Sequence, residues 1–189
     1  MKHSATHHMV CPWWMGYFLI CPVRRWFVDP ARLLSPFVRQ GMTVLEPGPG
    51  IGFFTLELAR MVGPCGRVVA IDIQPRMIEA LKRRAARAGL LERIDARASP
   101  QTSGCEEISC TVDFVLAFAM VHEVPDTAAF FFGAARAMKA GARLLLAEPP
   151  AHVSMDFFAV ELRQAAAAGL EMIERPAIGR NRTALLKKN

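Results

Sequence analysis

The sequence predicts an α/β fold built around a doubly wound, mostly parallel sheet of seven strands. Short β-branched runs alternate with longer helical patterns from Met42 onward. Strands separated by helices of about 10–15 residues imply right-handed crossovers between parallel neighbours. The chain has 189 residues, of which 52% are hydrophobic. This length and composition correspond to one globular domain with a sheet covered on both faces.

The first half of this pattern has clear start and stop signals. Pro75 stands where a helix begins, and Gly89 follows the last turn of the same helix, as is typical of helix ends. The expected elements are a strand at Thr43 to Glu46, a helix at Ile51 to Val62, a strand at Arg67 to Asp72, a helix at Pro75 to Ala88 and a strand at Arg93 to Ala98.

The second half continues the alternation and then ends differently. The expected elements are a strand at Asp113 to Phe118, a helix at Asp126 to Lys139, a strand at Ala142 to Glu148, a helix at Met155 to Ala168, and strands at Leu170 to Glu174 and Thr183 to Lys187. The last two strands are too close in sequence for a crossover helix. We therefore expect an antiparallel hairpin at the edge of the sheet.

Residues 1–40 form a separate segment before the sheet domain, which we place at residues 41–189. Aromatic residues recur there at helical spacing after Pro12, among them Trp13, Tyr17 and Phe18. Such a stripe is typical of core packing, and it also suits a helical lid that covers a binding pocket. We expect the lid, with Trp13 and Tyr17 contacting substrate.

A glycine-rich turn links the first predicted strand to the first predicted helix. Gly48, Gly50 and Gly52 alternate there, and glycines let the backbone turn sharply and let a ligand come close. Asp72 ends the next strand, where a carboxylate can accept hydrogen bonds from ribose hydroxyls. Dinucleotide sites prefer the spacing Gly-x-Gly-x-x-Gly. Glu46, just before the loop, disfavours a pyrophosphate and favours an ammonium group, which indicates an amino-acid-bearing nucleoside.

These residues resemble the class I S-adenosylmethionine-dependent methyltransferases, a family with a Rossmann-like fold, and the resemblance extends from about Met42 to the C-terminus. It implies that the methionyl part of S-adenosylmethionine binds at Glu46, Gly48, Gly50 and Gly52, and the ribose at Asp72, with Ile73 beside the adenine. We also assign Phe53, Ala98, Ser99 and Ala117 to the cofactor site. Ser99 stands near the place where this family often has an Asp that contacts adenine.

The segment after the fourth strand, which contains His122-Glu-Val-Pro, looks like the family motif beneath the transferring methyl group. Together with Cys11-Pro-Trp-Trp it resembles a subgroup of small bacterial and archaeal methyltransferases. We expect His122 to be catalytic and to contact substrate with Glu123. A structural hydrogen bond for His122 is the alternative. Glu148 and His152 follow the fifth strand toward the same edge, where Glu148 suits either substrate contact or hydrogen bonds to backbone amides.

Composition and charge narrow the other classes of function. The formal net charge of +6 comes from short, scattered basic groups, so a nucleic-acid partner is not favoured. Neither a signal peptide nor a membrane-spanning run is recognisable. Because no signal peptide is recognisable, we expect a cytoplasmic location and reduced thiols. The five cysteines lack Cys-x-x-Cys spacing, so we expect no metal site. The oligomeric state is left open.

The sequence therefore predicts S-adenosylmethionine-dependent methyl transfer to a small-molecule acceptor, with S-adenosylhomocysteine as the second product. Three alternatives stay open at this point. They are an RNA methyltransferase, a nucleoside-binding protein without turnover, and an NAD-binding protein.

Overall fold

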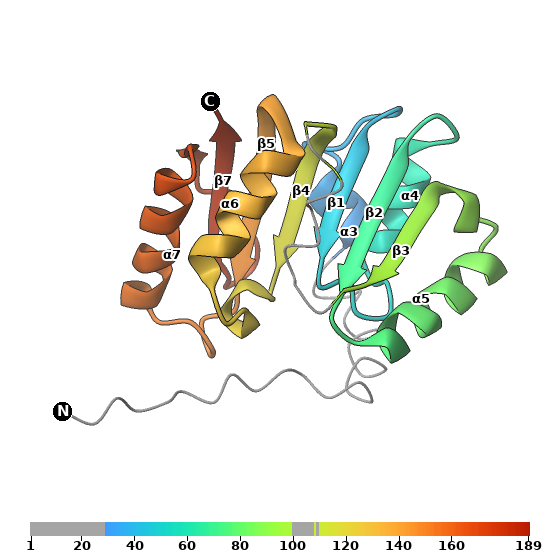
Figure 1. The fold of residues 1–189 in the computed structure, drawn as a ribbon, viewed down its shortest axis with the longest axis horizontal. Coiled ribbons are helices and arrows are strands. Elements are labelled where there is room, and N and C mark those ends of the chain that lie inside the picture. Colours follow the sequence, from blue (N-terminus) through green and yellow to red (C-terminus); the bar gives the residue numbers. More distant parts are fainter. Residues whose placement is uncertain (1–28, 100–107, 109) are drawn as a thin grey trace.

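A computed structural model describes residues 29–99, 108 and 110–189, and it contains the expected sheet (Figure 1). Seven strands lie in the order β3-β2-β1-β4-β5-β7-β6. Their bounds are β1 Thr43–Pro47, β2 Arg67–Asp72, β3 Ile94–Ala98, β4 Val112–Phe118, β5 Met138–Glu148, β6 Leu170–Glu174 and β7 Arg182–Lys188. The predicted seven-stranded, doubly wound α/β fold is confirmed.

Helices connect the strands and cover both faces of the sheet (Figure 1). Asp126 and Ser154 cap the helices that follow them, because each side chain accepts a hydrogen bond from a backbone N–H in the first turn. The helices are α3 Pro30–Leu34, α4 Thr55–Val62, α5 Pro75–Arg87, α6 Thr127–Ala137 and α7 Met155–Ala167, with short 3-10 turns η1 Leu91–Arg93 and η2 Val121–Glu123.

The strand pairing creates a switch in winding direction at the centre of the sheet. β1 pairs in parallel with both β2 and β4, and the chain winds outward from β1 in both directions. β5 pairs with β7, and β7 with β6, in antiparallel register, as the predicted hairpin requires. In open α/β sheets ligands bind at the carboxyl ends of strands beside such a switch point. That rule directs attention to the loops after β1 and β4.

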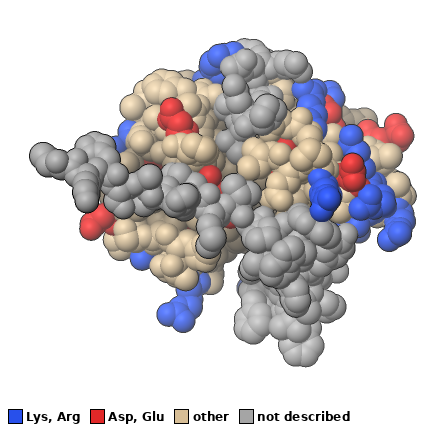
Figure 2. All heavy atoms as spheres, turned by 60° about the horizontal axis from the view of Figure 1, so that its bottom comes forward, with Lys and Arg blue, Asp and Glu red and all other residues tan. Residues whose placement is uncertain are grey.

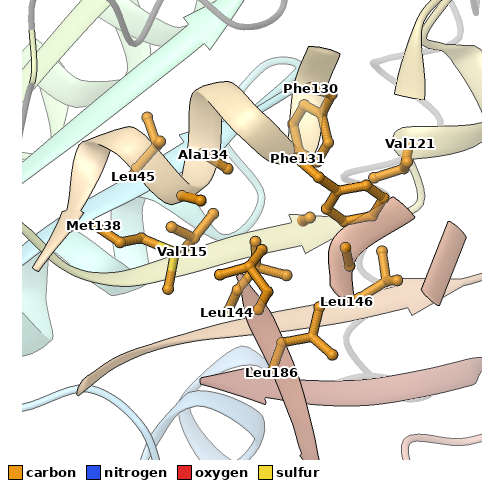
Figure 3. Close-up of a cluster of buried hydrophobic side chains, with 14 of the residues drawn as sticks. Leu45, Val115, Val121, Phe130, Phe131, Ala134, Met138, Leu144, Leu146 and Leu186 are labelled. Atoms are coloured by element: carbon orange, nitrogen blue, oxygen red, sulfur yellow. The ribbon is translucent and has the colours of Figure 1, made fainter. Parts of the chain in front are cut away.

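One apolar layer lies between the sheet and helices α6 and α7. Alternate strand residues face it, because successive side chains of a strand point to opposite faces. Figure 3 shows Leu45, Val115, Leu144 and Leu146 from the strands packed against the helix residue Phe131. Leu144, Leu146 and Phe131 are completely buried.

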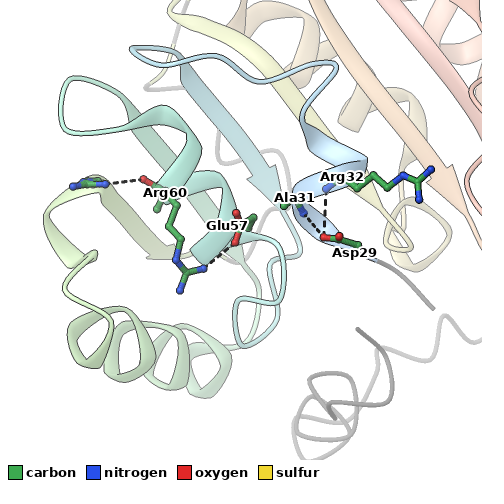
Figure 4. Close-up of polar contacts among 7 residues, drawn as sticks. Asp29, Ala31, Arg32, Glu57 and Arg60 are labelled. Carbon is green, nitrogen blue, oxygen red and sulfur yellow. Dashed lines mark hydrogen bonds and ion pairs between the residues drawn. The ribbon is translucent and has the colours of Figure 1, made fainter. Parts of the chain in front are cut away.

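The second apolar layer lies on the other face, under α3, α4 and α5. Val44, Val68, Phe114 and Leu145 contribute to it from the strands. Asp29 caps helix α3, because its side chain accepts hydrogen bonds from two backbone N–H groups (Figure 4). The next segment also packs into this layer, with the Phe37 ring stacked on Phe114 at 5.7 Å between centroids, so α3 and the residues that follow it are anchored to the sheet domain.

Three predicted boundaries were wrong by two or more residues. The helix predicted from Ile51 begins at Thr55, because the four preceding residues form a turn in which Gly52 has a φ of +87°. The helix predicted to end at Lys139 ends at Ala137, where β5 begins. Met138 pairs with Val112 of β4 instead. The chain therefore enters the sheet four residues before the predicted strand start at Ala142.

The predicted contacts of Trp13 and Tyr17 lie outside the described residues, so the helical lid stays a prediction. Within the described ranges, none of the helices is long and apolar enough to cross a membrane.

Candidate functional site: a carboxylate-flanked glycine turn beside a His–Glu pair

The glycine turn after β1 has the backbone shape that only glycine adopts without strain. Gly48, Gly50 and Gly52 have φ values of +64°, +54° and +87°. A Cβ atom on Gly48 would lie 2.9 Å from Cβ of Met120, and one on Gly52 would lie 2.4 Å from Cδ1 of Leu81. A Cβ atom on Gly50 would meet no described atom within 4 Å. The turn is therefore closely packed at both ends and open in the middle.

Asp72 fastens this turn to the loop after β2. Its Oδ2 accepts a hydrogen bond from the Gly50 N–H at 3.2 Å, and its Oδ1 accepts one from the Gln74 N–H at 2.8 Å. Burial raises the pKa of the Asp72 carboxyl to about 6, and the negative charge of Glu123 contributes in the same direction. The carboxylate thus stands between the two loops, where a ribose diol would offer it further donors.

Glu46, at the end of β1, is a buried carboxyl without a hydrogen-bonded partner on Oε2. Its side chain is 3% exposed, and among the described residues no group forms a hydrogen bond of normal geometry with Oε2. Burial raises the pKa of Glu46 to about 7. The hydroxyl of Thr55 beside it acts in the opposite direction, and the charge of Asp72 adds to the rise. Buried polar atoms are almost always paired in folded proteins. An ammonium group would satisfy this carboxylate.

The other predicted cofactor residues take different places around the turn. Ile73 follows Asp72 directly, and Ala98 pairs with Asp72 across β2 and β3. The Ser99 N–H donates to the Asp72 carbonyl at 3.0 Å. These three residues therefore lie next to Asp72. Phe53 is half-buried beside the turn, with its ring edge-on to Phe54. Ala117 is completely buried in the layer under α6 and α7.

His122 lies in η2, after β4, at the same edge of the sheet as the glycine turn. Its Nδ1 is hydrogen-bonded to Oε2 of Glu148, which is completely buried at the end of β5. Oε1 of Glu148 accepts hydrogen bonds from the N–H groups of Met120 at 3.3 Å and Val121 at 2.8 Å. One carboxylate therefore holds both the backbone of η2 and the imidazole.

The Glu148 carboxylate also changes the acidity of His122. Burial favours the neutral imidazole, but the hydrogen bond to Glu148 and the negative charges of Glu148 and Glu123 outweigh it. The net effect is that the pKa of His122 is raised above its ordinary value of 6.5. Of the two roles considered for Glu148, the structure contains the hydrogen bonds to backbone amides. Substrate contact by Glu148 stays a prediction.

Glu123 and His152 flank this pair. Glu123 is half-buried, and its negative charge contributes to raising the pKa values of both Asp72 and His122. The exposed ring of His152 meets the His122 ring edge-on at 5.2 Å between centroids. The segments after β1, β2, β4 and β5 thus converge at one edge of the sheet.

One buried acid beside the site was not singled out from the sequence. Glu161 in α7 is completely buried, and the charge of Glu148 acts on it. A signal was present, because Phe158, Glu161 and Ala165 recur at the spacing of one helix face. A carboxylate on an apolar helix face marks a buried ionisable group.

The sequence predicts no metal site anywhere in the chain, whereas the structure describes only part of the chain. Within residues 29–99, 108 and 110–189, no group of three or more His, Cys, Asp or Glu side chains is placed to hold a metal ion. Cys65 and Cys110 in these ranges are exposed thiols, and Sγ of Cys110 donates a hydrogen bond to the Arg136 carbonyl at 3.8 Å.

The fold and the site together define a doubly wound domain with a glycine turn flanked by two buried acids at its switch point. The family model described as "Methyltransferase domain" matches residues 39–185. The chain therefore belongs to this methyltransferase family, and the predicted membership of the S-adenosylmethionine-dependent methyltransferases is confirmed.

Individual relatives agree with this assignment. A solved S-adenosylmethionine-dependent methyltransferase from Aquifex aeolicus is similar to this chain with a TM-score of 0.80 and 26% identity, covering 94% of this chain and 98% of its own. A ubiquinone biosynthesis O-methyltransferase from Methylocella silvestris is 33% identical over 67% of this chain and 48% of its own length. A ubiquinone/menaquinone biosynthesis C-methyltransferase from an Enterobacter species is 32% identical over 59% of this chain and 44% of its own. The chain spans about half the length of these two curated relatives.

Proposed function

We propose that this chain transfers the methyl group of S-adenosylmethionine to a small-molecule acceptor that gives up a proton, with S-adenosylhomocysteine as the second product. The observation that carries the proposal is the position of the His122–Glu148 pair at the same sheet edge as the turn flanked by Glu46 and Asp72. A cofactor pocket and a base thus lie side by side.

The residues present fit the cofactor. The unpaired, buried carboxyl of Glu46 suits the ammonium group, and the open space at Gly50 allows a ligand to lie against the backbone. Asp72 suits the ribose hydroxyls, with Ile73 and Ser99 beside it for the base. The bound cofactor supplies a methyl group on a positively charged sulfur. The chain's own residues then have to hold the acceptor in line with it.

His122 provides the proton acceptor in this proposal. Because a carboxylate oxygen of Glu148 only accepts hydrogen bonds, Nδ1 of neutral His122 carries the proton, and Nε2 has the basic lone pair. The new bond forms between the acceptor atom and the methyl carbon while the sulfur–methyl bond breaks. The proton of the acceptor moves to Nε2 of His122. Phenols, enols, amines and thiols are acceptors of this kind.

The relatives support a small acceptor, since two are named for steps of quinone biosynthesis, one as an O-methyltransferase and one as a C-methyltransferase. We keep Trp13, Tyr17 and Glu123 as proposed acceptor contacts. An RNA acceptor would favour a continuous basic surface around the pocket mouth. In Figure 2 many Lys and Arg side chains of the described residues lie at the side of this edge where α5 is found. Among the described residues this one-sided distribution favours the small acceptor.

Calorimetry and a methyl-transfer assay test the proposal together. Binding of S-adenosylmethionine and S-adenosylhomocysteine, with none for NAD, is expected. Tight NAD binding without binding of the methyl donor would contradict it. Turnover is then measured with a panel of phenols, thiols and amines, and the His122→Asn variant should retain cofactor affinity but lose about 100-fold or more in kcat, as expected for removal of a general base. Saturated cofactor with no turnover on any acceptor would favour a nucleoside-binding protein instead.

A further inference from the structure

The chain leaves β4 through a strained turn at Ala119. The φ of Ala119 is +55°, in the left-handed region that a residue with a Cβ atom rarely adopts. Its N–H donates to the Ala147 carbonyl at 2.7 Å, so the pairing of β4 with β5 continues up to the turn. A strained conformation of this kind persists only where the surrounding contacts hold it, and it is often found at functional sites.

Glu148 supplies the contacts that hold this turn. It ends β5 directly after Ala147, and its completely buried side chain reaches the two residues after the strained one. Its Oε1 accepts hydrogen bonds from the N–H groups of Met120 at 3.3 Å and Val121 at 2.8 Å. Met120 stands at the N-terminal cap of η2, and its own side chain forms no capping hydrogen bond. The Glu148 carboxylate therefore acts as the cap of η2.

Met120 connects the strained turn to the cofactor side of the site. A Cβ atom on Gly48 would lie 2.9 Å from Cβ and 3.3 Å from Cγ of Met120, so the Met120 side chain lies directly against the glycine turn. Gly48 is held in turn by its N–H, which donates to the Ile71 carbonyl at 2.8 Å. A change in the backbone after β4 would therefore break or tighten the contact between Met120 and Gly48.

His122 connects the same turn to the proposed base. Its Nδ1 is hydrogen-bonded to Oε2 of Glu148, the oxygen that the two backbone N–H groups leave open. The two oxygens of one carboxylate thus hold the backbone at Met120 and the ring of His122. The position of the base relative to the glycine turn depends on this single side chain.

We infer that Glu148 is a positioning residue that holds the strained turn at Ala119, and that it thereby fixes Met120 against the glycine turn and His122 beside it. The inference rests on the proposed function for its catalytic meaning, because it concerns the placement of the methyl donor relative to the base. A misplacement of about 1 Å can cost about 100-fold in rate. Glu148 sets both positions together.

Two measurements on the full chain, without cofactor or acceptor, test the inference by NMR. The nuclear Overhauser effect between the Met120 side chain and Gly48 reports the contact at the glycine turn. The nitrogen shifts of His122, assigned with His122→Asn, report which ring nitrogen carries the proton. In the unaltered protein we expect the contact to be present and neutral His122 to carry its proton on Nδ1. The Kd for S-adenosylhomocysteine is measured on the same samples by calorimetry.

Two substitutions of Glu148 separate the backbone contact from the ring contact. In Glu148→Gln the amide oxygen can still accept from the backbone, whereas the NH2 group donates to Nδ1 of His122. The Met120–Gly48 contact should remain, the Kd should stay within about 2-fold, and neutral His122 should carry its proton on Nε2. Glu148→Met fills a similar volume but accepts no N–H bond. It should lose the Met120–Gly48 contact and the Nδ1–H preference, and its Kd should rise by about 5-fold or more.

Ala119→Gly tests whether strain is what Glu148 offsets. Glycine adopts a positive φ without the cost that a Cβ atom brings. In the double variant Ala119→Gly/Glu148→Met the Met120–Gly48 contact should return, and the Kd should be tighter than in Glu148→Met by about 5-fold or more. The Nδ1–H preference of His122 should stay lost, because no carboxylate faces the ring. A purely structural role of Glu148 would not produce this selective rescue.

Glu171→Met removes an exposed carboxyl on β6 and serves as the matched control, which should change none of these quantities. Circular dichroism establishes that each variant is folded. If Glu148→Met does not fold, the double variant should fold and show the Met120–Gly48 contact, since glycine removes the strain.

Three results would overturn the inference. A proton that stays on Nδ1 of His122 in Glu148→Gln would mean that Glu148 does not orient the ring. An intact Met120–Gly48 contact in folded Glu148→Met would mean that Glu148 does not hold the turn. A double variant that recovers neither folding nor the contact would mean that strain at Ala119 is not what Glu148 offsets. Because the NMR readouts need neither cofactor nor acceptor, they are independent of whether methyl transfer is found.

Discussion

The open middle of the glycine turn allows ligand binding to be separated from protein stability. Gly50 and Gly89 both have positive φ values, +54° and +66°, and a Cβ atom on either would meet no described atom within 4 Å. Gly50 lies in the turn after β1, whereas Gly89 follows the far end of α5. Replacing each by Ala therefore imposes the same kind of backbone strain at two places with different proposed roles.

The size of the effect follows from these geometries. A left-handed conformation costs a residue with a Cβ about 1–2 kcal/mol, so both variants should lose about 2–8 °C in Tm. Only the new methyl group of Gly50→Ala would intrude on a ligand lying against the turn. Overpacking of this kind costs about 1–3 kcal/mol, which corresponds to a rise in Kd of about 5- to 150-fold.

Thermal unfolding and calorimetry with S-adenosylhomocysteine check both numbers on the same samples. We expect equal losses of Tm and a weakened Kd in Gly50→Ala alone. Unaltered affinity in Gly50→Ala would refute the placement of the cofactor at this turn. An equal loss of affinity in Gly89→Ala would show that the weaker binding of Gly50→Ala results from reduced stability and not from contact between the new methyl group and the ligand.

Three further predictions concern charge and packing. Cofactor affinity should rise with pH as Asp72 and Glu46 ionise, since their pKa values are raised to about 6 and about 7. In Glu46→Gln the calorimetric affinity should be lower and the higher of these two steps absent, so a pH profile identical to that of the unaltered protein would contradict the role of Glu46. Part of the free energy of unfolding of the cofactor-free protein should be lost as the pH rises from about 4.5 to about 8. Folding raises the pKa of Glu161 from 4.5 to about 8, so in this range the folded protein keeps a proton that the unfolded chain has released. Urea unfolding at several pH values measures this component, and an unchanged pH dependence in Glu161→Gln would argue against it. Phe131→Ala removes a completely buried ring and should cost about 3–5 kcal/mol in urea unfolding. The neighbouring Phe132, 52% exposed, should tolerate Ala within about 0.5 kcal/mol, and similar losses for both would contradict the assigned core.

Much of the fold could be predicted because its signals are local. The alternation of strands and helices, the proline at the start of α5 and the closing hairpin are each written in a short stretch of sequence, and each is present in the structure. The late start of α4 follows from the local glycine turn, whereas the early end of α6 lies where pairing between distant segments decides the backbone. Met138 enters the sheet because Val112 lies opposite to it, which the sequence around Met138 does not show.

The functional site, like the fold, could be predicted in part. The turn flanked by Glu46 and Asp72 could be read in advance, since residues at the ends of neighbouring parallel strands meet at one edge of the sheet. The contact between Met120 and Gly48 could not, because it depends on how closely the loop after β4 approaches the turn.

The sequence by itself determined the class of fold, the glycine turn with its two acids, and His122 as a residue to examine. Only the tertiary structure decided that Glu148 holds His122 and that Glu161 is completely buried. The physical reason is that hydrogen-bond partners and burial come from segments that are far apart in the sequence. Glu148 ends β5, whereas the groups that donate to it follow β4, and the two segments are adjacent only after the chain has folded.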